Sequence, residues 1–245
     1  MKTLILAAGY ATRLYPLTKH WPKPLLVVKE KPIINHIVER IDDLKENNEI
    51  IVITNEKFFH QFKDWGQNTK TKAKLTVISD KTTSADDRLG AIGDINFAIQ
   101  GKKINDDLLV IGGDNLFAFD LTGFIRNLRE KKIDAAVGLY DIKDPSMVKH
   151  YGVVTLDKNN RIIDFKEKPK KSASTLISMC IYYFSKENLK LIKKYICRKD
   201  LHDTSGDYIK WLSKEIDVLG YIFDGIWYDI GDIITFYHAS VAFND

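Results

Sequence analysis

The chain has 245 residues, which is enough to bury about 70–75% of its unfolded surface. Hydrophobic residues make up 44% of the chain and charged residues 29%, and these shares are usual for a globular protein. Its net charge of +4 is modest and dispersed, which argues against a nucleic-acid partner, and the roughly 18 consecutive apolar residues of a membrane helix are absent. Two cysteines, Cys180 and Cys197, are too few for a disulfide framework or a zinc site, so we expect buried free thiols in a cytoplasmic protein with no membrane partner.

The first predicted element is a short apolar strand at residues 4–8, of the kind that is buried in a parallel sheet. Gly9 follows it, where we expect a turn with positive φ and close approach of a ligand to the backbone. Two cations, Arg13 and Lys23, come next in a loop that three prolines stiffen. Backbone N–H groups around Gly9 together with these two cations indicate a cradle for a polyphosphate.

Helices and strands then alternate along the chain. Apolar residues at helical spacing predict a helix over 32–46, and a continuous apolar run predicts a buried strand at 49–54. Asn55 is placed to cap a helix over 56–65, and alternating residues predict a strand at 73–79. This alternation is typical of βαβ units and therefore of a mostly parallel sheet.

A polar loop at 80–89 leads into a predicted helix that begins at Gly90, a junction where glycine permits close approach of a ligand. The next predicted strand, 108–111, ends in two glycines followed by Asp114. Open α/β sheets bind ligands at the carboxyl ends of their strands. A carboxylate at that position suits Mg²⁺, which takes one or two carboxylates and bridges phosphates.

The second half of the chain changes character. After a helix at 120–132 and a strand at 134–140, residues 151–165 form a predicted hairpin and 176–184 a further strand. We therefore expect one α/β domain over 1–245, a Rossmann-like, mostly parallel sheet sandwiched by helices, with an inserted β region beside the site.

The remaining predicted elements are helices at 186–195 and 206–215, a strand at 217–224, and a helix from Ile233 to Asp245. Between the last two lies the sequence Trp-Tyr-Asp-Ile-Gly at 227–231.

Five motifs in this order carry a resemblance to a known family. Residues 6–18 are Leu-Ala-Ala-Gly-Tyr-Ala-Thr-Arg-Leu-Tyr-Pro-Leu-Thr, and Pro-Lys-Pro-Leu follows at 22–25. They resemble the signature of the nucleotidyltransferase (nucleoside-diphosphate-sugar pyrophosphorylase) family, except that Ala11 replaces its second glycine and adds a Cβ where a phosphate would pass. The other motifs are Gly-Asp-Asn at 113–115, Tyr-Gly-Val-Val at 151–154, Glu-Lys-Pro at 167–169 and Trp-x-Asp-x-Gly at 227–231.

The resemblance implies an Mg²⁺-dependent enzyme that joins an NTP to a sugar-1-phosphate, or a similar phosphate monoester, and releases pyrophosphate. It implies catalytic roles for Arg13 and Lys23, and metal binding by Asp114 and Asp229, with Asp232 as a competitor for the second position. The implied nucleotide-binding residues are Leu6, Ala7, Ala8, Gly9, Thr12, Arg13, Lys23, Gly90 and Asp114. The implied acceptor-binding residues are Asn115, Gly152, Glu167 and Lys168.

Two alternatives from other classes stay open. A metal-dependent glycosyltransferase also uses a Rossmann-like sheet, but it normally has an Asp-x-Asp pair, which residues 113–116 do not provide. A non-catalytic sensor or assembly subunit would be expected to lose some of the charged site residues, all of which are present. The base, the acceptor and the oligomeric state remain open. In the resembled family, glucose-1-phosphate with dTTP or UTP is the commonest pairing, and short members include cytidylyltransferases acting on phosphocholine.

Overall fold

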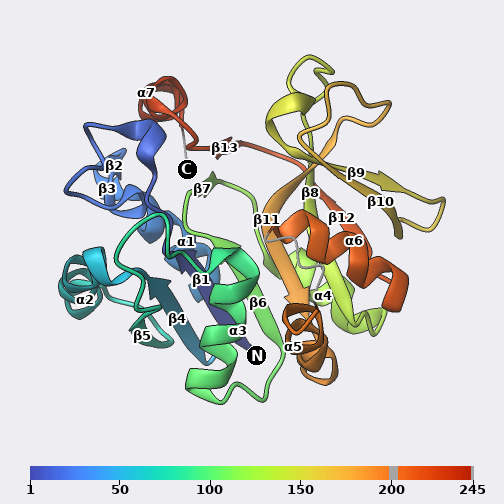
Figure 1. Ribbon diagram of the computed structural model, residues 1–245, viewed down its shortest axis with the longest axis horizontal. Helices are drawn as coiled ribbons and strands as arrows, with labels where there is room; N and C mark the ends of the chain where they lie inside the picture. Colours follow the sequence, from blue (N-terminus) through green and yellow to red (C-terminus); the bar gives the residue numbers. More distant parts are fainter. Residues whose placement is uncertain (199–203, 244–245) are drawn as a thin grey trace.

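The computed structural model describes residues 1–198 and 204–243 and contains a nine-stranded sheet covered by helices on both faces (Figure 1). The strand order is β10-β9-β11-β6-β1-β4-β5, with β8 paired to β11 and β12 paired to β8. The strands of this sheet are β1 (Lys2–Ala7), β4 (Glu49–Thr54), β5 (Lys74–Ser79), β6 (Leu108–Gly112), β8 (Ala135–Asp141), β9 (Gly152–Leu156), β10 (Ile162–Glu167), β11 (Leu176–Phe184) and β12 (Leu219–Phe223).

The parallel part of the sheet is built around β1, which pairs in parallel with β4 on one side and with β6 on the other. All six residues of β4 are buried, as expected for a central strand covered on both faces. The carboxyl ends of β1 and β6 therefore lie side by side, which places the loops after them at the same edge of the sheet.

Helices cover both faces, as the sequence predicted. Helices α1 (Ile33–Asp42), α2 (Phe59–Asn68) and α4 (Thr122–Glu130) pack on the face that contains Ile5 and Val52. Helices α3 (Gly90–Lys102), α5 (Leu189–Ile196) and α6 (Ser205–Glu215) pack on the opposite face, with Leu4 and Ile51. Neighbouring residues of one strand thus enter different cores, because side chains alternate along a strand.

The inserted β region is continuous with the main sheet. Strands β9 and β10 form the predicted antiparallel hairpin, β9 contacts β11, and β11 runs antiparallel to β6. The register of β11 shifts between Ser178 and Tyr182, and Cys180 within this bulge has a φ of 56°. In Figure 1 the hairpin rises on one side of the site and the β1–β4–β5 half lies on the other.

Two small ribbons complete the fold: β2 (Val27–Val28) with β3 (Lys31–Pro32), and β7 (Asn115–Phe117) with β13 (Trp227–Asp229). Helix α7 (Ile233–Ala242) packs beside β2 and β13. The sequence predicted that this last helix continues to Asp245, but the helix ends at Ala242 and Phe243 has an extended backbone; residues 244–245 lie outside the described part of the chain. The helix predicted over 32–46 ends at Asp42.

Two further sequence expectations concern the cap at residue 55 and the cysteines. Asn55 does cap its helical segment, accepting a hydrogen bond from the backbone N–H of Phe58 at 3.0 Å. Both thiols are free, but the expectation that both are buried is wrong, because Cys197 is exposed and Cys180 is only half-buried by surface area. Their apolar sequence neighbours do not determine which way each side chain faces.

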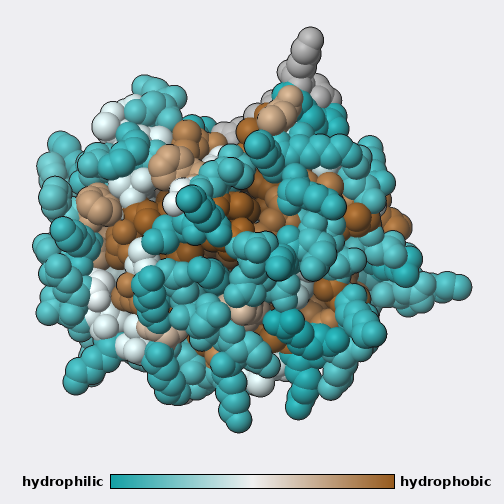
Figure 2. Space-filling model, turned by 90° about the horizontal axis from the view of Figure 1, so that it is seen from below, coloured by the Kyte–Doolittle hydropathy of each residue, from teal (hydrophilic) through white to brown (hydrophobic). Residues whose placement is uncertain are grey.

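One face of the molecule is largely hydrophilic. The face seen in Figure 2 carries mostly hydrophilic side chains, with apolar groups visible between them. Across the described residues, the structure has no helix that is both long enough and apolar enough to cross a membrane.

Candidate active site

The loop after β1 places the two predicted cations. Two 3₁₀ turns, Thr12–Leu14 and Lys23–Leu25, contain Arg13 and Lys23. The positive φ expected at Gly9 is wrong, because the left-handed residue of this loop is Ala11, with a φ of 47°. Hydrogen bonds hold the loop on both sides: Asn55 Nδ2 donates to the Ala8 carbonyl at 2.9 Å, and Thr18 Oγ1 donates to the Ala11 carbonyl at 2.7 Å.

Two adjoining cavities flank this loop. One of about 250 Å³ contains Arg13 and Lys23, and the other, of about 310 Å³, extends to Gly90 at the start of α3. Both are lined by Leu6, Gly9, Thr12 and Asp114. Ala7 lines the first and Ala8 the second. Each residue that the family resemblance implied for nucleotide binding therefore lies at the wall of one or both cavities.

Asp114 stands at the carboxyl edge of the sheet because β6 ends just before it. Gly113 N–H donates to the Leu6 carbonyl at 2.8 Å, and a Cβ added at Gly113 would lie only 2.8 Å from that oxygen. A side chain at position 113 would thus push the loop after β6 away from β1. The glycine keeps Asp114 close to the loop that carries Lys23.

Lys23 contacts both segments that carry predicted metal ligands. Its Nζ lies 2.6 Å from Asp114 Oδ2 and donates to the Ile230 carbonyl at 2.9 Å, next to Asp229. Burial alone would raise the pKa of Asp114, but the cations of Lys23 and Arg13 hold it below its usual value. Asp114 is therefore ionised at neutral pH.

The β7–β13 ribbon brings Asp229 to the same place. Asp229 pairs in register with Asn115, and the Ile230 N–H donates to the Asp114 carbonyl at 3.3 Å. The Asn115 side chain, predicted to bind acceptor, instead joins the two strands: it accepts from Trp227 Nε1 at 2.7 Å and donates to the Gly112 carbonyl at 3.2 Å. It is 3% exposed, so its visible role is to fix the ribbon.

Asp229 lacks the direct ammonium contact of Asp114. Burial, and next the negative charge of Asp114, raise the pKa of Asp229 to about 6 despite Lys23 and Arg13. A Cβ built on Gly231 would lie 3.6 Å from Asp229 Oδ2 and 4.0 Å from Arg13 Nη1, so both charged groups border this glycine. Burial and the charge of Asp114 thus favour the protonated form of Asp229 more than the two cations favour its ionised form.

Asp232, the competitor for the second metal position, is engaged elsewhere. Its Oδ1 accepts from the backbone N–H of Thr235 at 2.8 Å and from Thr235 Oγ1 at 3.0 Å, in a capping box at the start of α7. These hydrogen bonds lower the pKa of Asp232. Its carboxylate is therefore used to cap a helix, whereas that of Asp229 borders Asp114.

The chemistry of Asp114 and Asp229 fits Mg²⁺. Within residues 1–198 and 204–243 no group of three or more Asp, Glu, His or Cys side chains forms a closed metal cage. Two carboxylates at a cavity edge are nevertheless sufficient for Mg²⁺, since it keeps waters and takes its remaining ligands from phosphates. The negative charge of Asp114 contributes to the raised pKa of Asp229, and a bound cation would reduce this repulsion between the two carboxylates.

The predicted acceptor residues lie on the inserted hairpin. Lys168 follows β10 with a φ of 43°, and its N–H donates to the Tyr151 carbonyl at 3.0 Å. Its side chain is 60% exposed, with Nζ 3.9 Å from Glu167 Oε1. Burial raises the pKa of Glu167, although Lys168 opposes this shift. The lysine is thus held at its backbone, and its ammonium remains accessible.

Two glycines make room for the hairpin side chains. A Cβ added at Gly152 would lie 2.4 Å from the Phe165 ring, and one added at Gly206 would lie 2.3 Å from that ring. The same added atom at Gly206 would lie 2.9 Å from Glu167 Oε2. Gly152, which the resemblance placed in the acceptor site, therefore acts through the packing of Phe165 and Glu167, and Gly206 was not singled out from the sequence.

An aromatic group that the sequence did not single out connects the acceptor side to the metal side. Trp227 packs against Tyr140 and Tyr151, with ring centroids 5.3 and 5.9 Å away. Burial and the nearby charges of Asp229 and Asp232 raise the pKa of Tyr151 to about 12. The hairpin therefore reaches the carboxylate of β13. The neighbouring Trp-x-Asp and Tyr-Gly motifs gave a signal for these residues, but not for their contact.

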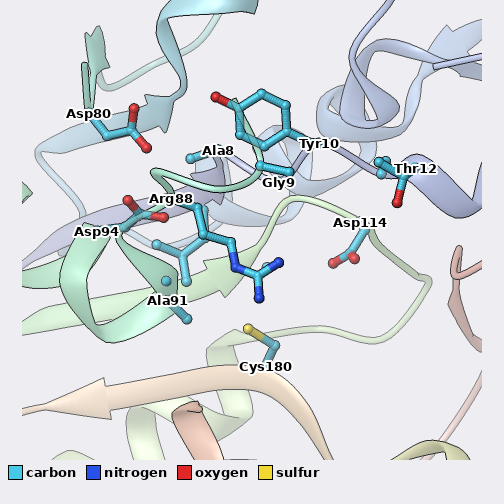
Figure 3. A pocket seen from close by; sticks show the side chains of 15 residues that line it. Ala8, Gly9, Tyr10, Thr12, Asp80, Arg88, Ala91, Asp94, Asp114 and Cys180 are labelled. Carbon is cyan, nitrogen blue, oxygen red and sulfur yellow. The ribbon is translucent and has the colours of Figure 1, made fainter. Parts of the chain in front are cut away.

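The larger cavity also contains polar groups that sequence reasoning left unassigned (Figure 3). Asp80 follows β5 and Asp94 lies in α3, and the view shows them together at one end of the cavity. Arg88 extends from the loop, and its guanidinium is directed toward Asp114 and Cys180. Composition had marked the loop 80–89 as polar, but could not show which of its charges face the cavity.

Comparison with known proteins extends over the whole chain. Residues 2–245 match the family model described as nucleotidyl transferase. The bifunctional protein GlmU of Methanocaldococcus jannaschii is 35% identical over 234 residues, which are 94% of this chain and 51% of that protein. The UTP–glucose-1-phosphate uridylyltransferase of Synechocystis sp. is 28% identical over 248 residues, 98% of this chain and 62% of that protein. The chain thus spans about half the length of the GlmU relative.

A solved structure gives the same result for the fold. UDP-glucose pyrophosphorylase complexed with UDP-glucose superposes with a TM-score of 0.82 at 22% sequence identity, over 98% of this chain and 97% of that chain. The α/β fold predicted from the sequence is therefore confirmed both by the architecture and by this neighbour.

Proposed function

The chain belongs to the nucleotidyl transferase family, and from this premise we propose that it is an Mg²⁺-dependent enzyme that transfers a nucleotidyl group from an NTP to a sugar-1-phosphate or a similar phosphate monoester. The observation that supports this most is the arrangement around Asp114. Arg13, Lys23 and both cavities adjoin Asp114, the carboxylate of Asp229 borders the same place, and Tyr151 connects it to the hairpin that carries Lys168.

In the proposed reaction, a phosphate oxygen of the acceptor attacks the α-phosphorus of the NTP, and the bond from that phosphorus to the bridging oxygen breaks, so that pyrophosphate leaves. The attacking oxygen is already ionised, so no general base is needed. Positioning and charge neutralisation then supply the rate enhancement. Arg13 would bind the triphosphate and stabilise the charge that develops on the leaving pyrophosphate.

Lys23 has a second task in this scheme. In the metal-free protein it neutralises Asp114 at 2.6 Å. Asp114 and Asp229 would hold Mg²⁺, which would supply Lewis-acid stabilisation of the phosphate charge. With the carboxylates compensated in this way, the Lys23 ammonium is available to the reacting phosphates. The same lysine thus stabilises the site before the substrate arrives and binds phosphate afterwards.

Lys168 would hold the phosphate of the acceptor, and Glu167 would accept a hydrogen bond from a hydroxyl of the acceptor. This division is supported by the exposure of the Lys168 side chain and by the position of the Glu167 carboxyl group, which lies next to Gly206. Tyr151 lies between these residues and Asp229, so the acceptor would enter from the hairpin side.

The test is release of pyrophosphate. The purified protein is incubated with Mg²⁺, one of five nucleotides (ATP, CTP, GTP, UTP or dTTP) and one of several phosphorylated acceptors, including glucose-1-phosphate and phosphocholine. We expect release that needs both the nucleotide and an acceptor, and that falls by at least about a hundredfold in Arg13→Gln. A glycosyltransferase would instead use a nucleoside-diphosphate sugar and release no pyrophosphate. Nucleotide binding without release would indicate a non-catalytic subunit, and either result would overturn the proposal.

A further inference from the structure

The larger cavity ends at two buried carboxyl groups. Asp80 is 3% exposed and Asp94 is 7% exposed, and both line the cavity. Burial raises the pKa of Asp80, and Figure 3 shows its carboxyl group beside that of Asp94 at this end of the cavity. Two neighbouring carboxyl groups in a buried site repel one another when both are ionised, which favours the protonated form of one of them.

The hydrogen atoms around this pair point toward it. Thr82 donates to Asp80 Oδ1 from its backbone N–H and from its Oγ1, each at 2.8 Å. Because the Thr82 hydroxyl proton is used in this way, the Tyr10 hydroxyl, 3.2 Å from Thr82 Oγ1, is the donor in their contact. What this end of the cavity offers a ligand is therefore oxygen lone pairs, which accept hydrogen bonds.

The charges of the two cavities decide which part of a nucleotide lies where, and this step rests on the proposed function. The smaller cavity contains Arg13 and Lys23 and suits the phosphates. Phosphates would be repelled from Asp80 and Asp94 at the far end of the larger cavity. Arg88 is directed back toward Asp114 (Figure 3), close to the junction of the two cavities. The nucleobase is then the part of the nucleotide that reaches the carboxyl pair.

We propose that the Asp80–Asp94 pair selects a base with an exocyclic amino group, so that CTP, ATP or GTP is preferred over UTP and dTTP. An amino group presents N–H donors to the carboxyl oxygens. Uracil and thymine present a single ring N–H between two carbonyl oxygens, whose lone pairs would face those of the carboxyl groups. The carbonyl oxygens of the base and the carboxyl oxygens would then be buried without hydrogen-bond donors. Leaving buried polar groups unpaired in this way costs binding free energy, and the site would therefore discriminate against uracil and thymine.

The first test is binding, measured without turnover. The dissociation constants of the five nucleotides are determined by titration calorimetry with the wild-type protein and Mg²⁺, in the absence of an acceptor. We expect at least one amino-bearing nucleotide to bind at least about tenfold more tightly than UTP and dTTP, the ratio for one hydrogen bond to a charged group. UTP or dTTP binding as tightly as each amino-bearing nucleotide would overturn the inference.

The second test replaces a carboxyl group by an amide of the same shape. In Asp94→Asn the new NH₂ group can donate to a base carbonyl, so the preference over UTP should shrink by about tenfold or reverse. Asp86→Asn is the matched control, because it removes the same charge at an exposed position in the loop that precedes α3. It should leave the preference unchanged. A preference that persists in Asp94→Asn would assign base selection to other groups; Asp80→Asn provides the same comparison if Asp94→Asn does not fold.

The results separate this inference from the proposed function. Pyrophosphate release with UTP or dTTP as the preferred substrate would overturn the inference and leave the function intact. A preference for amino-bearing nucleotides without pyrophosphate release from any acceptor would overturn the function and support the base selection. Absence of binding for all five nucleotides would overturn both.

Discussion

Lys23 Nζ lies 2.6 Å from Asp114 Oδ2, although the two residues are 91 positions apart in the chain. The same ammonium group donates to the Ile230 carbonyl, directly after Asp229. One lysine therefore links the loop after β1 to the end of β6 and to the end of β13, and the integrity of the metal-free site depends on it.

Replacing Lys23 by Met should destabilise the metal-free protein, because Asp114 and Asp229 then face one another with less compensation. Asp114 keeps 35% of its side-chain surface in contact with solvent, so we expect a loss of about 1–2 kcal/mol. Thermal unfolding in EDTA and in Mg²⁺ checks this, and Mg²⁺ should recover part of the loss. Lys19→Met, in the same loop and exposed, is the control. An unchanged Tm in EDTA would contradict the compensating role of Lys23.

Asp229→Asn should stabilise the metal-free protein near pH 7. The folded-state pKa of Asp229, about 6, lies above the unfolded value near 4, so the native state binds the extra proton and wild-type stability falls as pH rises from about 4 to 6. The variant lacks this loss, and at pH 7 it should be more stable by about 1–2 kcal/mol. Denaturation at pH 4 and pH 7 measures the difference. Equal stability of the two proteins at both pH values would rule out the raised pKa.

The same carboxyl groups should be needed for catalysis. Asp114→Asn and Asp229→Asn should each lower kcat by a factor of about a hundred or more while the fold is kept, and the double variant should lose little beyond the worse single one. Asp232→Asn retains a good helix cap and should keep both stability and Mg²⁺ dependence. Loss of Mg²⁺ dependence in Asp232→Asn alone would show that Asp232 is the ligand.

Lys168→Ala should raise the KM for the acceptor by roughly ten- to a hundredfold, because it removes a charge-assisted hydrogen bond to the acceptor phosphate. The Kd for the nucleotide should stay within about twofold, since Lys168 lies on the hairpin and lines neither nucleotide cavity. Lys170→Ala, a nearby exposed lysine, is the control. An acceptor KM that does not change would show that Lys168 is a solvated surface residue and does not bind the acceptor phosphate.

Gly206→Ala should both destabilise the protein and weaken acceptor binding. The added Cβ would lie 2.3 Å from the Phe165 ring and 2.9 Å from Glu167 Oε2, so the hairpin must shift. Overpacking of this kind costs about 1–3 kcal/mol. Gly101→Ala is a matched control: its Cβ meets nothing within 4 Å inside α3, and it should stabilise slightly. Calorimetry and acceptor KM together distinguish a local shift of Glu167 from general loss of stability.

Ala11→Gly should be neutral or stabilising by up to about 1 kcal/mol, because a φ of 47° strains alanine but not glycine. Ala11→Val should lose at least about 1 kcal/mol, since β-branched residues tolerate this conformation least. Urea denaturation of the two variants checks the order. A more stable valine variant would mean that the loop adopts another backbone conformation in solution.

The sequence predicted the elements well where their pattern was strong. The buried run at 49–54 and the alternating run at 176–184 became β4 and β11 with the expected bounds, because their patterns and their tertiary environments agree. The helix predicted over 32–46 was too long at its end, since Leu44 is buried by packing after the last helical turn. Hydrophobic period alone does not distinguish a helix end from a buried turn.

The residues of the candidate site could be predicted only where they belong to a recognisable sequence motif. The signature loop gave Arg13 and Lys23, but the sequence did not show that the backbone at Ala11 is left-handed, a conformation that glycine adopts without strain. The ammonium contact between Lys23 and Asp114 and the cap made by Asp232 depend on side-chain directions, which no spacing along the chain specifies. Asp80 and Asp94 come together only because β5 and α3 fold against the same loop.

The β7–β13 ribbon imposes an order on the assembly of the protein. The residues around both nucleotide cavities lie between Leu6 and Cys180, so these cavities can form once β11 has joined the sheet. Asp229 reaches the site only when β13 pairs with β7, and this pairing closes a loop of more than a hundred residues. We expect it to form late, because contacts between residues far apart in the chain have a high entropic cost. We therefore expect Asp229 to join Asp114 after the residues of both cavities are in place, so that the proposed metal site would be the last part of the molecule to be completed.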